Sequence, residues 1–523
     1  MPKIKLFLII KIRNSVDDHS NFYCLMNESQ TPKAIFFWTL VVLFWLTAGA
    51  IIGYAFGYRF NFKSGIFVYA GSITLKTTPQ EVDVYVDGIL MPSKSFNRLN
   101  NSYHIGGVRP GNYLLEVKAP GYQSWSKKIS VHSGVSTEFW NVILTQDSYA
   151  REDYESAGIQ KFFISPRKNL AAFSQQIDNK FFVKIFDPGT LEMTQVFVAD
   201  DYVFTKDEKE NIEWSPEAHR LIIPAVNDQQ KNYFIASADN SQDEVNLKDL
   251  TGDSNLSHVR WDPKNKDVLF YMSDNNLYRL DLNDLTTKKL AAENIASYDL
   301  SPKALFYFQL PEGIIYKTNF AATDTPAQIT TSGPANMADS SYQIIVYDED
   351  RIVFLNKSHL LYIYNKGETE TYFHAISNNA TGSQFSDDGK KLLLWNNNEI
   401  SAYFVRKWEV QPARNEDELM SITKFSDTIA NVQWTRDYEH ALFTNNNKVK
   451  LIELDKRDHR NMMDVLSLND STSVLVNNFT DGKLYYTEKN EQGQNSLHAI
   501  YFPERTTFFQ SLFPSGANTA IQN

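Results

Sequence analysis

The feature that most constrains how this chain can fold is a short motif that recurs from residue 165 to residue 480. Its clearest copy is Trp214-Ser215-Pro216, which stands where an apolar run would enter a turn. Aligned copies are centred on Ser165, Ser215, Asp262, Ser301, Asp348, Ser386, Thr435 and Thr480, of which Asp348 and Thr480 are the weakest. Eight markers over 315 residues give a mean period of about 45 residues, which is typical of repeats that each form one small sheet.

One repeat shows the parts that such a sheet needs. After Trp261-Asp262-Pro263 come a strand over 268–271, a polar turn and a second strand over 277–280. A single sheet cannot bury both of its faces, so the repeats are expected to stack radially and close into a ring. The sequence therefore predicts a β-propeller over residues 158–513 with seven or eight four-stranded blades, and the eight markers favour eight.

Two groups of side chains in the repeats have structural interpretations. Trp214, Trp261 and Trp434 each precede a turn marker and are expected to pack between blades. The charged run Lys206–Glu210 is interpreted as a solvated loop.

The turn copies also carry a family resemblance. Trp214-Ser215-Pro216 and Ser386-Asp387-Asp388-Gly389 resemble the turn of TolB-type and WD-repeat-like propellers, which often reads Trp-Ser-Pro-Asp-Gly. The resemblance implies the fold and leaves the function open, because propellers serve both as binding platforms and as enzymes.

A long apolar segment precedes the repeats. Residues 34–58 contain no charged residue and are bracketed by Lys33 and Arg59, so they are predicted to form a single transmembrane helix that anchors the chain. A cleaved signal peptide, suggested by Ala48-Gly49-Ala50, is the alternative, but the apolar stretch continues past that point. Residues 1–33 are expected to be a cytoplasmic lead, with Met26 as an alternative start. Basic residues flank both ends of the segment, so charge alone leaves its orientation open.

Small residues recur within the apolar segment. Gly49, Gly53 and Gly57 follow one another at four-residue intervals and therefore share one helix face. Such faces let two helices approach closely, which predicts a homodimer through the membrane helix. The alternative is that glycine is simply common in membrane helices.

Residues 71–145 are expected to form a smaller β-sandwich. Strands are predicted at 72–76, 82–86, 113–119, 124–131 and 137–144, separated by turns such as Asp87-Gly88 and Pro120-Gly121. The order and spacing of Gly71–Leu75, Val84–Gly88, Arg109–Tyr113 and Ala119–Tyr122 resemble the PEGA domain, an extracytoplasmic module of bacterial and archaeal envelope proteins. Pro79-Gln80-Glu81-Val82 replaces the tetrapeptide that names that family. The resemblance implies a surface module without catalytic residues.

Charge and cysteine content exclude some functions. The chain has 51 Lys and Arg against 62 Asp and Glu, and residues 1–63 hold seven of the basic and three of the acidic ones, so the remainder carries a formal charge of −15. An acidic body is a poor partner for nucleic acid. Cys24 is the only cysteine, so no disulfide can form within the chain.

The sequence contains none of the local motifs that carry common chemistries. Gly-x-Ser-x-Gly, His-Glu-x-x-His, Cys-x-x-Cys, the Walker loop and the dinucleotide glycine pattern are all absent. Carboxylate pairs need no local motif, but the adjacent acids Asp200-Asp201 and Asp387-Asp388 are expected in turns, because neighbours on a strand point to opposite faces. The sequence assigns no catalytic, cofactor-binding or metal-binding residue.

These features predict a membrane-anchored, non-catalytic scaffold whose sandwich and propeller lie outside the cell membrane and bind an envelope protein or glycan. Residues 514–523 are expected to be a flexible tail. The alternative is an envelope enzyme that cleaves polysaccharide with two carboxylates in the propeller channel. Two acids about 5–10 Å apart in one cleft would favour that enzyme, and a channel filled by aromatic side chains would favour the scaffold.

Overall fold

The computed structural model describes residues 31–55, 58–61, 66–92, 96–97, 100–154, 158–165, 170–206, 210–228, 230–239, 243–284, 289–334 and 342–502. Contacts divide the chain into one unit that ends at Tyr69 and a second that begins at Ala70. Residues 1–30 of the predicted lead, including Met26, lie outside the described residues, as do residues 503–513 of the predicted propeller and the predicted tail.

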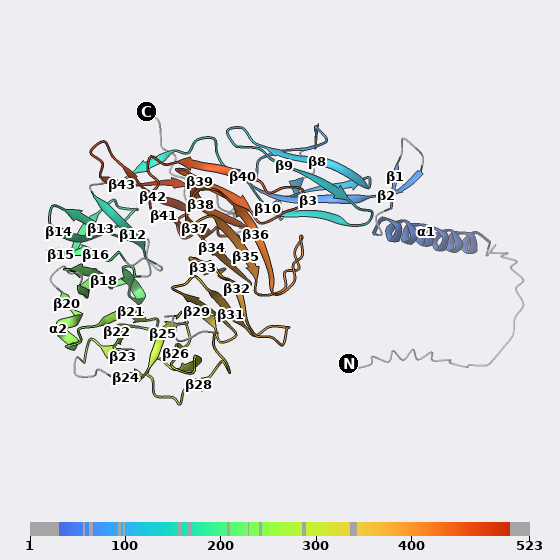
Figure 1. Cartoon of the computed structure of the whole chain (residues 1–523). Coiled ribbons are helices and arrows are strands. Elements are labelled where there is room, and N and C mark those ends of the chain that lie inside the picture. Colours follow the sequence, from blue (N-terminus) through green and yellow to red (C-terminus); the bar gives the residue numbers. More distant parts are fainter. Residues whose placement is uncertain are drawn as a thin grey trace, which may run out of the picture. The chain divides into compact units, whose positions relative to one another are not determined.

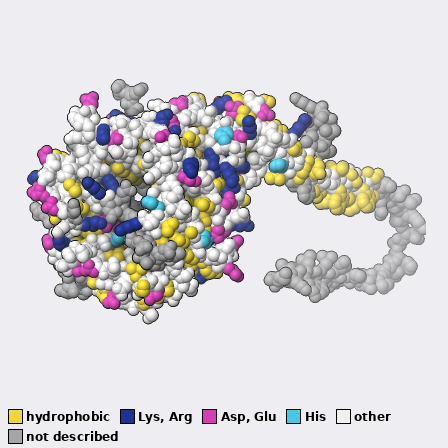
Figure 2. Space-filling view, in the orientation of Figure 1, with side chains coloured by type: hydrophobic (Ala, Val, Ile, Leu, Met, Phe, Trp, Pro, Cys, Tyr) yellow, Lys and Arg dark blue, Asp and Glu magenta, His cyan; other side chains and the backbone are white. Residues whose placement is uncertain are grey.

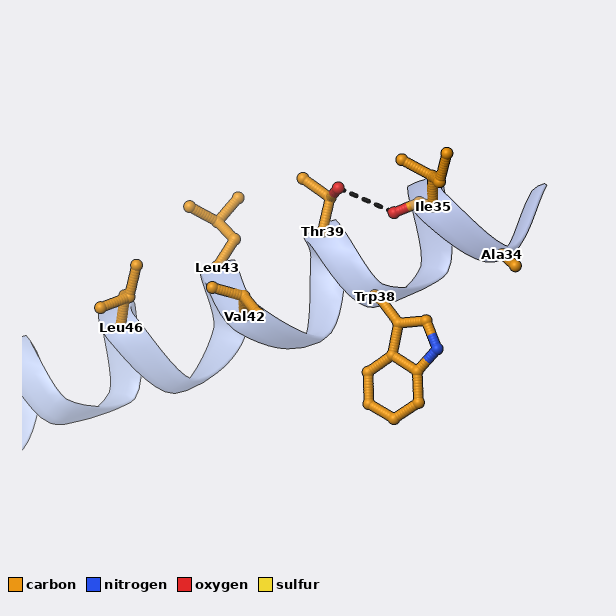
Figure 3. Close-up of a pocket in the computed structure, with 7 residues that line it drawn as sticks. All are labelled: Ala34, Ile35, Trp38, Thr39, Val42, Leu43 and Leu46. Atoms are coloured by element: carbon orange, nitrogen blue, oxygen red, sulfur yellow. Dashed lines mark hydrogen bonds between the residues drawn. The ribbon is translucent and has the colours of Figure 1, made fainter. Parts of the chain in front are cut away.

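The first unit consists of helix α1 (Thr31–Ala55) and a hairpin of strands β1 (Tyr58–Asn61) and β2 (Ile66–Tyr69). Within α1, Ala34–Tyr54 is long and apolar enough to cross a membrane. Thr39 Oγ1 donates to the carbonyl of Ile35 at 2.7 Å and Thr47 bonds to its own helix in the same way, so neither hydroxyl needs water (Figure 3). The predicted helix over 34–58 was too long at its end, since Tyr58 opens a strand that is rich in β-favouring aromatic residues.

The sandwich is built from two four-stranded sheets. One sheet has the order β10-β3-β7-β6 and the other β5-β4-β8-β9, with strands β3 (Gly71–Thr78), β4 (Asp83–Val86), β5 (Ile89–Leu90), β6 (Phe96–Asn97), β7 (Ser102–Val108), β8 (Gly111–Lys118), β9 (Trp125–Val131) and β10 (Ser136–Ile143). All five predicted strands are present, whereas β5, β6 and β7 were not predicted. Strand β7 was missed because Gly106-Gly107 weakens its strand pattern.

Inward-facing residues of the two sheets form one core. Ile73, Leu75, Leu115 and Val117 are completely buried there, and Trp125 is 1% exposed. Gly71 begins β3 where a Cβ atom would lie 2.3 Å from the carbonyl oxygen of His132, so only glycine fits. The alternation seen in the sequence therefore corresponds to a packed sandwich interior.

The propeller contains eight sheets in the described part of the chain, which follow one another around a ring in Figure 1. From the innermost strand outwards, the first four sheets are β12 (Ile159–Ile164), β13 (Ala171–Ile177), β14 (Lys180–Phe186), β15 (Met193–Asp200); β16 (Val203–Phe204) with β17 (Glu213–Trp214), β18 (Arg220–Asn227), β19 (Gln230–Ser237), β20 (Glu244–Asn246); β21 (Leu256–Asp262), β22 (Asn265–Ser273), β23 (Asn276–Asp281), β24 (Lys289–Ala292); and β25 (Ile295–Leu300), β26 (Leu305–Gln309), β27 (Ile314–Thr318), β28 (Ala327–Gln328). A short helix, α2 (Leu247–Thr251), follows β20.

The remaining four sheets complete the ring. They are β29 (Tyr342–Asp348), β30 (Arg351–Asn356), β31 (Leu361–Asn365), β32 (Phe373–Ser377); β33 (Gly382–Phe385), β34 (Lys391–Trp395), β35 (Glu399–Phe404), β36 (Glu418–Lys424); β37 (Ile429–Trp434), β38 (His440–Asn445), β39 (Lys448–Glu453), β40 (Met462–Ser467); and β41 (Leu475–Asn478), β42 (Lys483–Lys489), β43 (Asn495–Tyr501) with β11 (Arg151–Asp153). The eight-bladed prediction is confirmed, and in the second blade two short strands share the innermost place.

The sequence markers have one structural role. Each stands at or just after the end of an innermost strand, where the chain turns into the next strand of the same blade. In the best copies the turn is closed by backbone and side chain together: Ser215 N donates to the carbonyl of Arg220 at 2.8 Å, and Arg220 N donates to Ser215 Oγ at 2.9 Å. Ser386 makes the equivalent bonds with Lys391. The repeat is therefore strongest where the turn needs a buried hydroxyl or carboxylate, as at six of the eight markers, whereas Asp348 and Thr480, the weakest copies, are not buried.

The ring is closed by strands from both ends of the propeller. Strand β11 pairs with β43, and Arg151 lies opposite Ile500. Lys483 Nζ is 2.7 Å from Glu152 Oε2 across the same pairing. Strand β11 precedes Gly158, the predicted start of the propeller, so this pairing extends the propeller to Arg151.

Candidate functional site

The three tryptophans that precede turn markers join neighbouring blades. Trp214 Nε1 donates to the carbonyl of Phe163 at 3.3 Å, Trp261 Nε1 to that of Glu213 at 3.1 Å, and Trp434 Nε1 to that of Gln384 at 3.0 Å. Each acceptor belongs to the preceding blade, and all three indoles are at least 94% buried. Their contacts agree with the expected packing role between blades.

The residues two positions before the markers line the inner wall of the ring. Their side chains accept hydrogen bonds from backbone N–H groups of the next blade: Glu213 from Trp261 at 3.1 Å, Asp299 from Val346 at 2.8 Å, and Gln384 from Trp434 at 3.1 Å. These bonds connect the innermost strand of one blade to the innermost strand of the next. Sequence analysis did not single out this position, although aligning the repeats on their markers would have found it.

Arg260 occupies the same position in the third blade and lies between two carboxylates. Its Nε is 2.7 Å from Glu213 Oε2 and its Nη1 is 3.2 Å from Asp299 Oδ1. Burial raises the pKa of Glu213 and the positive charge of Arg260 opposes that rise, while Glu213 raises the pKa of Arg260. The Arg260 side chain is still 44% exposed, so this charged row faces the solvent of the channel.

A cavity of about 670 Å³ opens beside this row. Five consecutive blades line it, through residues of their innermost strands, of the segment just before β17 and of β19: Ile164, Glu210, Asn211, Ile212, Glu213, Trp214, Tyr233, His258, Val259, Arg260, Tyr298, Asp299, Gln343, Ile344 and Ile345. Figure 2 shows a hollow in the propeller face with Lys, Arg and His side chains beside it. The volume falls within the range of small-molecule sites, and we call this cavity the channel pocket.

Glu210 is the most deeply buried acid of the channel pocket, with 5% of its surface exposed. Its Oε1 pairs with Lys231 Nζ at 2.9 Å, whereas Oε2 is buried without a hydrogen-bond partner in the part of the chain that the structure describes. The predicted solvated loop over Lys206–Glu210 was therefore wrong at its end. Glu210 continues the buried alternation of Ile212 and Trp214, which is the signal that could have revealed it.

Two acids of the channel pocket share one cation. Glu213 and Asp299 face the same pocket, but both are held by Arg260. Among the described residues no group of three His, Cys, Asp or Glu side chains could hold a metal ion. The channel pocket offers a ligand a mixed wall of charged and apolar groups. Glu210 Oε2 lies buried in this wall without a hydrogen-bond partner among the described residues.

The predicted helix-packing glycines lie on α1. Gly49 and Gly53 have nothing within 4 Å of the place where a Cβ atom would be, and Gly57 lies outside the described residues. Packing through this face therefore stays a prediction.

A second charged site, which sequence analysis missed, joins the sandwich to the seventh blade. Lys127 of β9 is completely buried, and its Nζ lies 2.7 Å from Glu453 Oε1, 2.9 Å from the carbonyl oxygen of Asp455 and 3.0 Å from that of Arg457. The carbonyl of His459 is a fourth acceptor. Trp125 Nε1 donates to the other oxygen of Glu453 at 2.9 Å. We call this group the sandwich joint.

Two amide side chains of the propeller extend the joint along the edges of the sandwich sheets. Asn461 accepts from the backbone N–H of Ser126 at 3.3 Å and donates to the carbonyl of the same residue at 3.2 Å. Gln411 accepts from Glu138 N at 3.2 Å and donates to the carbonyl of Ser136 at 2.9 Å. Each amide pairs with an edge strand as another strand would, so the propeller covers the edges of β9 and β10.

Comparison with known proteins finds only distant likeness to solved structures. No family model matches this sequence, and no curated protein is similar to it. The Dos1 propeller matches 68% of this chain and 95% of its own, with a TM-score of 0.45 and 11% identity. The propeller domain of Cps50 (Swd1) from Myceliophteria thermophila matches 67% and 98% (TM-score 0.39, 11% identity), and an oligogalacturonate lyase in complex with manganese matches 67% and 99% (TM-score 0.36, 12% identity).

Proposed function

We propose that this chain is a single-pass membrane protein of the cell envelope that binds a partner outside the membrane without catalysing a reaction. In this proposal α1 is the anchor, the PEGA-like sandwich and the TolB-like propeller form the extracytoplasmic body, and the channel pocket receives part of an envelope protein or glycan. The observation that carries the proposal is the cavity of about 670 Å³, whose wall includes the buried Glu210 with one carboxylate oxygen that has no partner among the described residues.

The sandwich joint supports a display role. A body that is held by a buried Lys127 and by two edge-pairing amides presents its propeller in a fixed relation to the sandwich. Such fixed placement suits a scaffold, because less freedom is lost when a partner binds a preorganised surface.

The rival function is a polysaccharide-cleaving envelope enzyme. It would need one carboxyl as acid and another as base or nucleophile across the bound substrate. Glu213 and Asp299 are the closest candidates in the channel pocket, but both bind the guanidinium of Arg260, which lies between them. We therefore favour the non-catalytic role.

The membrane placement can be tested with the full chain carrying a C-terminal tag. Protease added to intact spheroplasts should remove the sandwich and the propeller and leave a protected fragment that contains α1. Full protection of the tag until the membrane is dissolved would contradict the extracytoplasmic placement. Release of the intact body without protease would favour the signal-peptide alternative.

The predicted homodimer has a separate test. Replacing Gly49, Gly53 and Gly57 by Leu should abolish self-association in a membrane two-hybrid assay, because bulky side chains separate the two backbones. Replacing Ala48 and Ala55 by Leu provides a control, because their spacing places them on the other side of the helix. An unchanged signal in the glycine variant would exclude this packing face.

A further inference from the structure

The hairpin that follows α1 has one aromatic face. Register pairs Tyr58 with Tyr69 and Phe60 with Phe67, while Arg59 pairs with Val68 and Asn61 with Ile66. Residues opposite each other in a hairpin share a face, and alternate residues along a strand share it too. Positions 58, 60, 67 and 69 therefore belong to one face, and every residue at these positions is Tyr or Phe.

The described side chains at the base of this face are open to solvent. The rings of Tyr58 and Tyr69 lie 4.9 Å apart and are tilted by 32°. Tyr58 is 49% exposed and Tyr69 is 40% exposed. A two-stranded hairpin is at best marginally stable in water, so an aromatic face of this kind needs a surface to lie against.

The hairpin's place in the chain identifies that surface. The apolar span ends at Tyr54 and β1 begins at Tyr58. Even fully extended, the chain between these two residues covers at most about 14 Å. The headgroup layer on each side of the hydrocarbon is roughly 5–8 Å deep, so the hairpin begins in this layer or within about 9 Å of its outer edge. Contacts also group the hairpin with α1 in the unit that ends at Tyr69. Tyrosine rings are enriched at this level of a bilayer, because the ring is apolar and its hydroxyl remains hydrated.

We propose that the β1–β2 hairpin is an interfacial anchor that lies with its aromatic face in the boundary between lipid headgroups and acyl chains. The inference rests on the proposed membrane function of α1 and adds a second lipid contact to it. The hairpin then restricts how the chain leaves the membrane.

Site-specific fluorescence on the full chain in lipid nanodiscs tests this placement. In a Cys24→Ser background, an environment-sensitive dye is attached at Phe67→Cys, Val68→Cys or Leu43→Cys. Quenching is measured with iodide in water and with lipids that carry a doxyl group near the headgroup or deep in the acyl chain. We expect the dye at 67 to be quenched severalfold more by the shallow doxyl lipid than the dye at 68, and severalfold less by iodide.

The controls separate the hairpin from the anchor. The dye at 43 should be quenched by the deep doxyl lipid, and its failure would overturn the membrane span. Deep quenching at 43 together with equal iodide quenching at 67 and 68 would overturn the hairpin placement alone. A dye at 67 that neither quencher reaches would mean that protein covers the aromatic face, which also overturns it. Tyr58→Cys and Arg59→Cys repeat the comparison on β1 if a substitution in β2 disturbs the fold.

Discussion

The sandwich joint and the channel pocket are both built around a cation, and they differ in what is left open. Lys127 has no exposed surface and four acceptors, and its carboxylate partner Glu453 is also buried. Arg260 has two carboxylate partners but is 44% exposed, and nearby Glu210 keeps one oxygen without a hydrogen-bond partner among the described residues.

This difference separates a structural site from a binding site. A buried charge is tolerated only when its partners are complete, so Lys127 can be changed only at a high cost in stability. The partly exposed ion pairs of Arg260 are expected to contribute little to stability. The nearby Oε2 of Glu210, which has no partner among the described residues, can be satisfied by water or by a ligand. The two regions differ in whether each charged group has all of its hydrogen-bond partners, more than in how much charge they carry.

The largest effect is expected where backbone pairing joins the chain. Truncation after Asn490 removes β43 and leaves β11 and β42 without their partner. The whole propeller should be destabilised, because an open ring exposes two strand edges. Removing only residues 515–523 is the control and should matter little. A single, undiminished thermal transition in the truncated protein would contradict the closed ring.

At the sandwich joint, Lys127→Met should lower the free energy of unfolding by about 3–5 kcal/mol, because it leaves the buried carboxylate of Glu453 without its cation. Lys128→Met is a matched control, since Lys128 is exposed on the same strand and should change stability by no more than about 0.5 kcal/mol. Urea denaturation measures both. Equal losses of stability for Lys127→Met and Lys128→Met would show that burial of Lys127 in the sandwich joint does not matter for stability.

In the channel pocket, Arg260→Met should cost roughly 1 kcal/mol or less in urea denaturation, because its ion pairs are partly exposed. Its effect should instead appear in binding, since Glu213 and Asp299 would then add uncompensated negative charge to the pocket. A loss of stability as large as that of Lys127→Met would show that Arg260 is structural.

The smallest effect concerns pH and the buried pair of Asp437 and His440, whose charged atoms lie 2.8 Å apart in the seventh blade. Burial opposes the charge of each group, but the partner prevails: the pKa of Asp437 falls to about 2 and that of His440 rises above its ordinary 6.5. A raised histidine pKa stabilises the fold fully below 6.5 and is lost as pH rises through the folded value. A lowered aspartate pKa stabilises above 3.8 and is lost as pH falls toward 2.

The pair should therefore contribute most between about pH 4 and pH 6.5. His440→Gln should cost more stability at pH 5.5 than at pH 9 in urea denaturation. A larger loss at pH 9 would reverse the assigned direction of the shift.

Much of the fold was predictable because it depends on local sequence patterns. The eight turn markers all stand at or just after the end of an innermost strand, so their spacing predicted the number of blades, and Val84 and Val86 alternate as the sandwich core requires. Strand β11 could not be predicted, because three polar residues acquire strand geometry only by pairing with β43. Its partner lies more than 340 residues away in the sequence.

The charge sites were less predictable for the same reason. Lys127 occupies an inward position of β9 between Trp125 and Ile129, which marks it as unusual, but its acceptors come from the distant seventh blade. Glu210 was assigned to a solvated loop because its neighbours are charged, although it continues a buried alternation. Which charged side chains come into contact depends on how distant blades pack together. The sequence pattern of a single strand therefore does not predict it.

The measurement that tests the account most directly is retention of envelope components by the full chain in nanodiscs. Wild type, Glu210→Gln and Lys128→Met would be mixed with solubilised envelope protein and glycan, and the retained material identified by mass. The account predicts a component that wild type and Lys128→Met retain and that Glu210→Gln loses, with no change in its own mass after incubation. Equal retention by all three proteins would contradict a channel binding site, and a shortened glycan product would contradict the non-catalytic role.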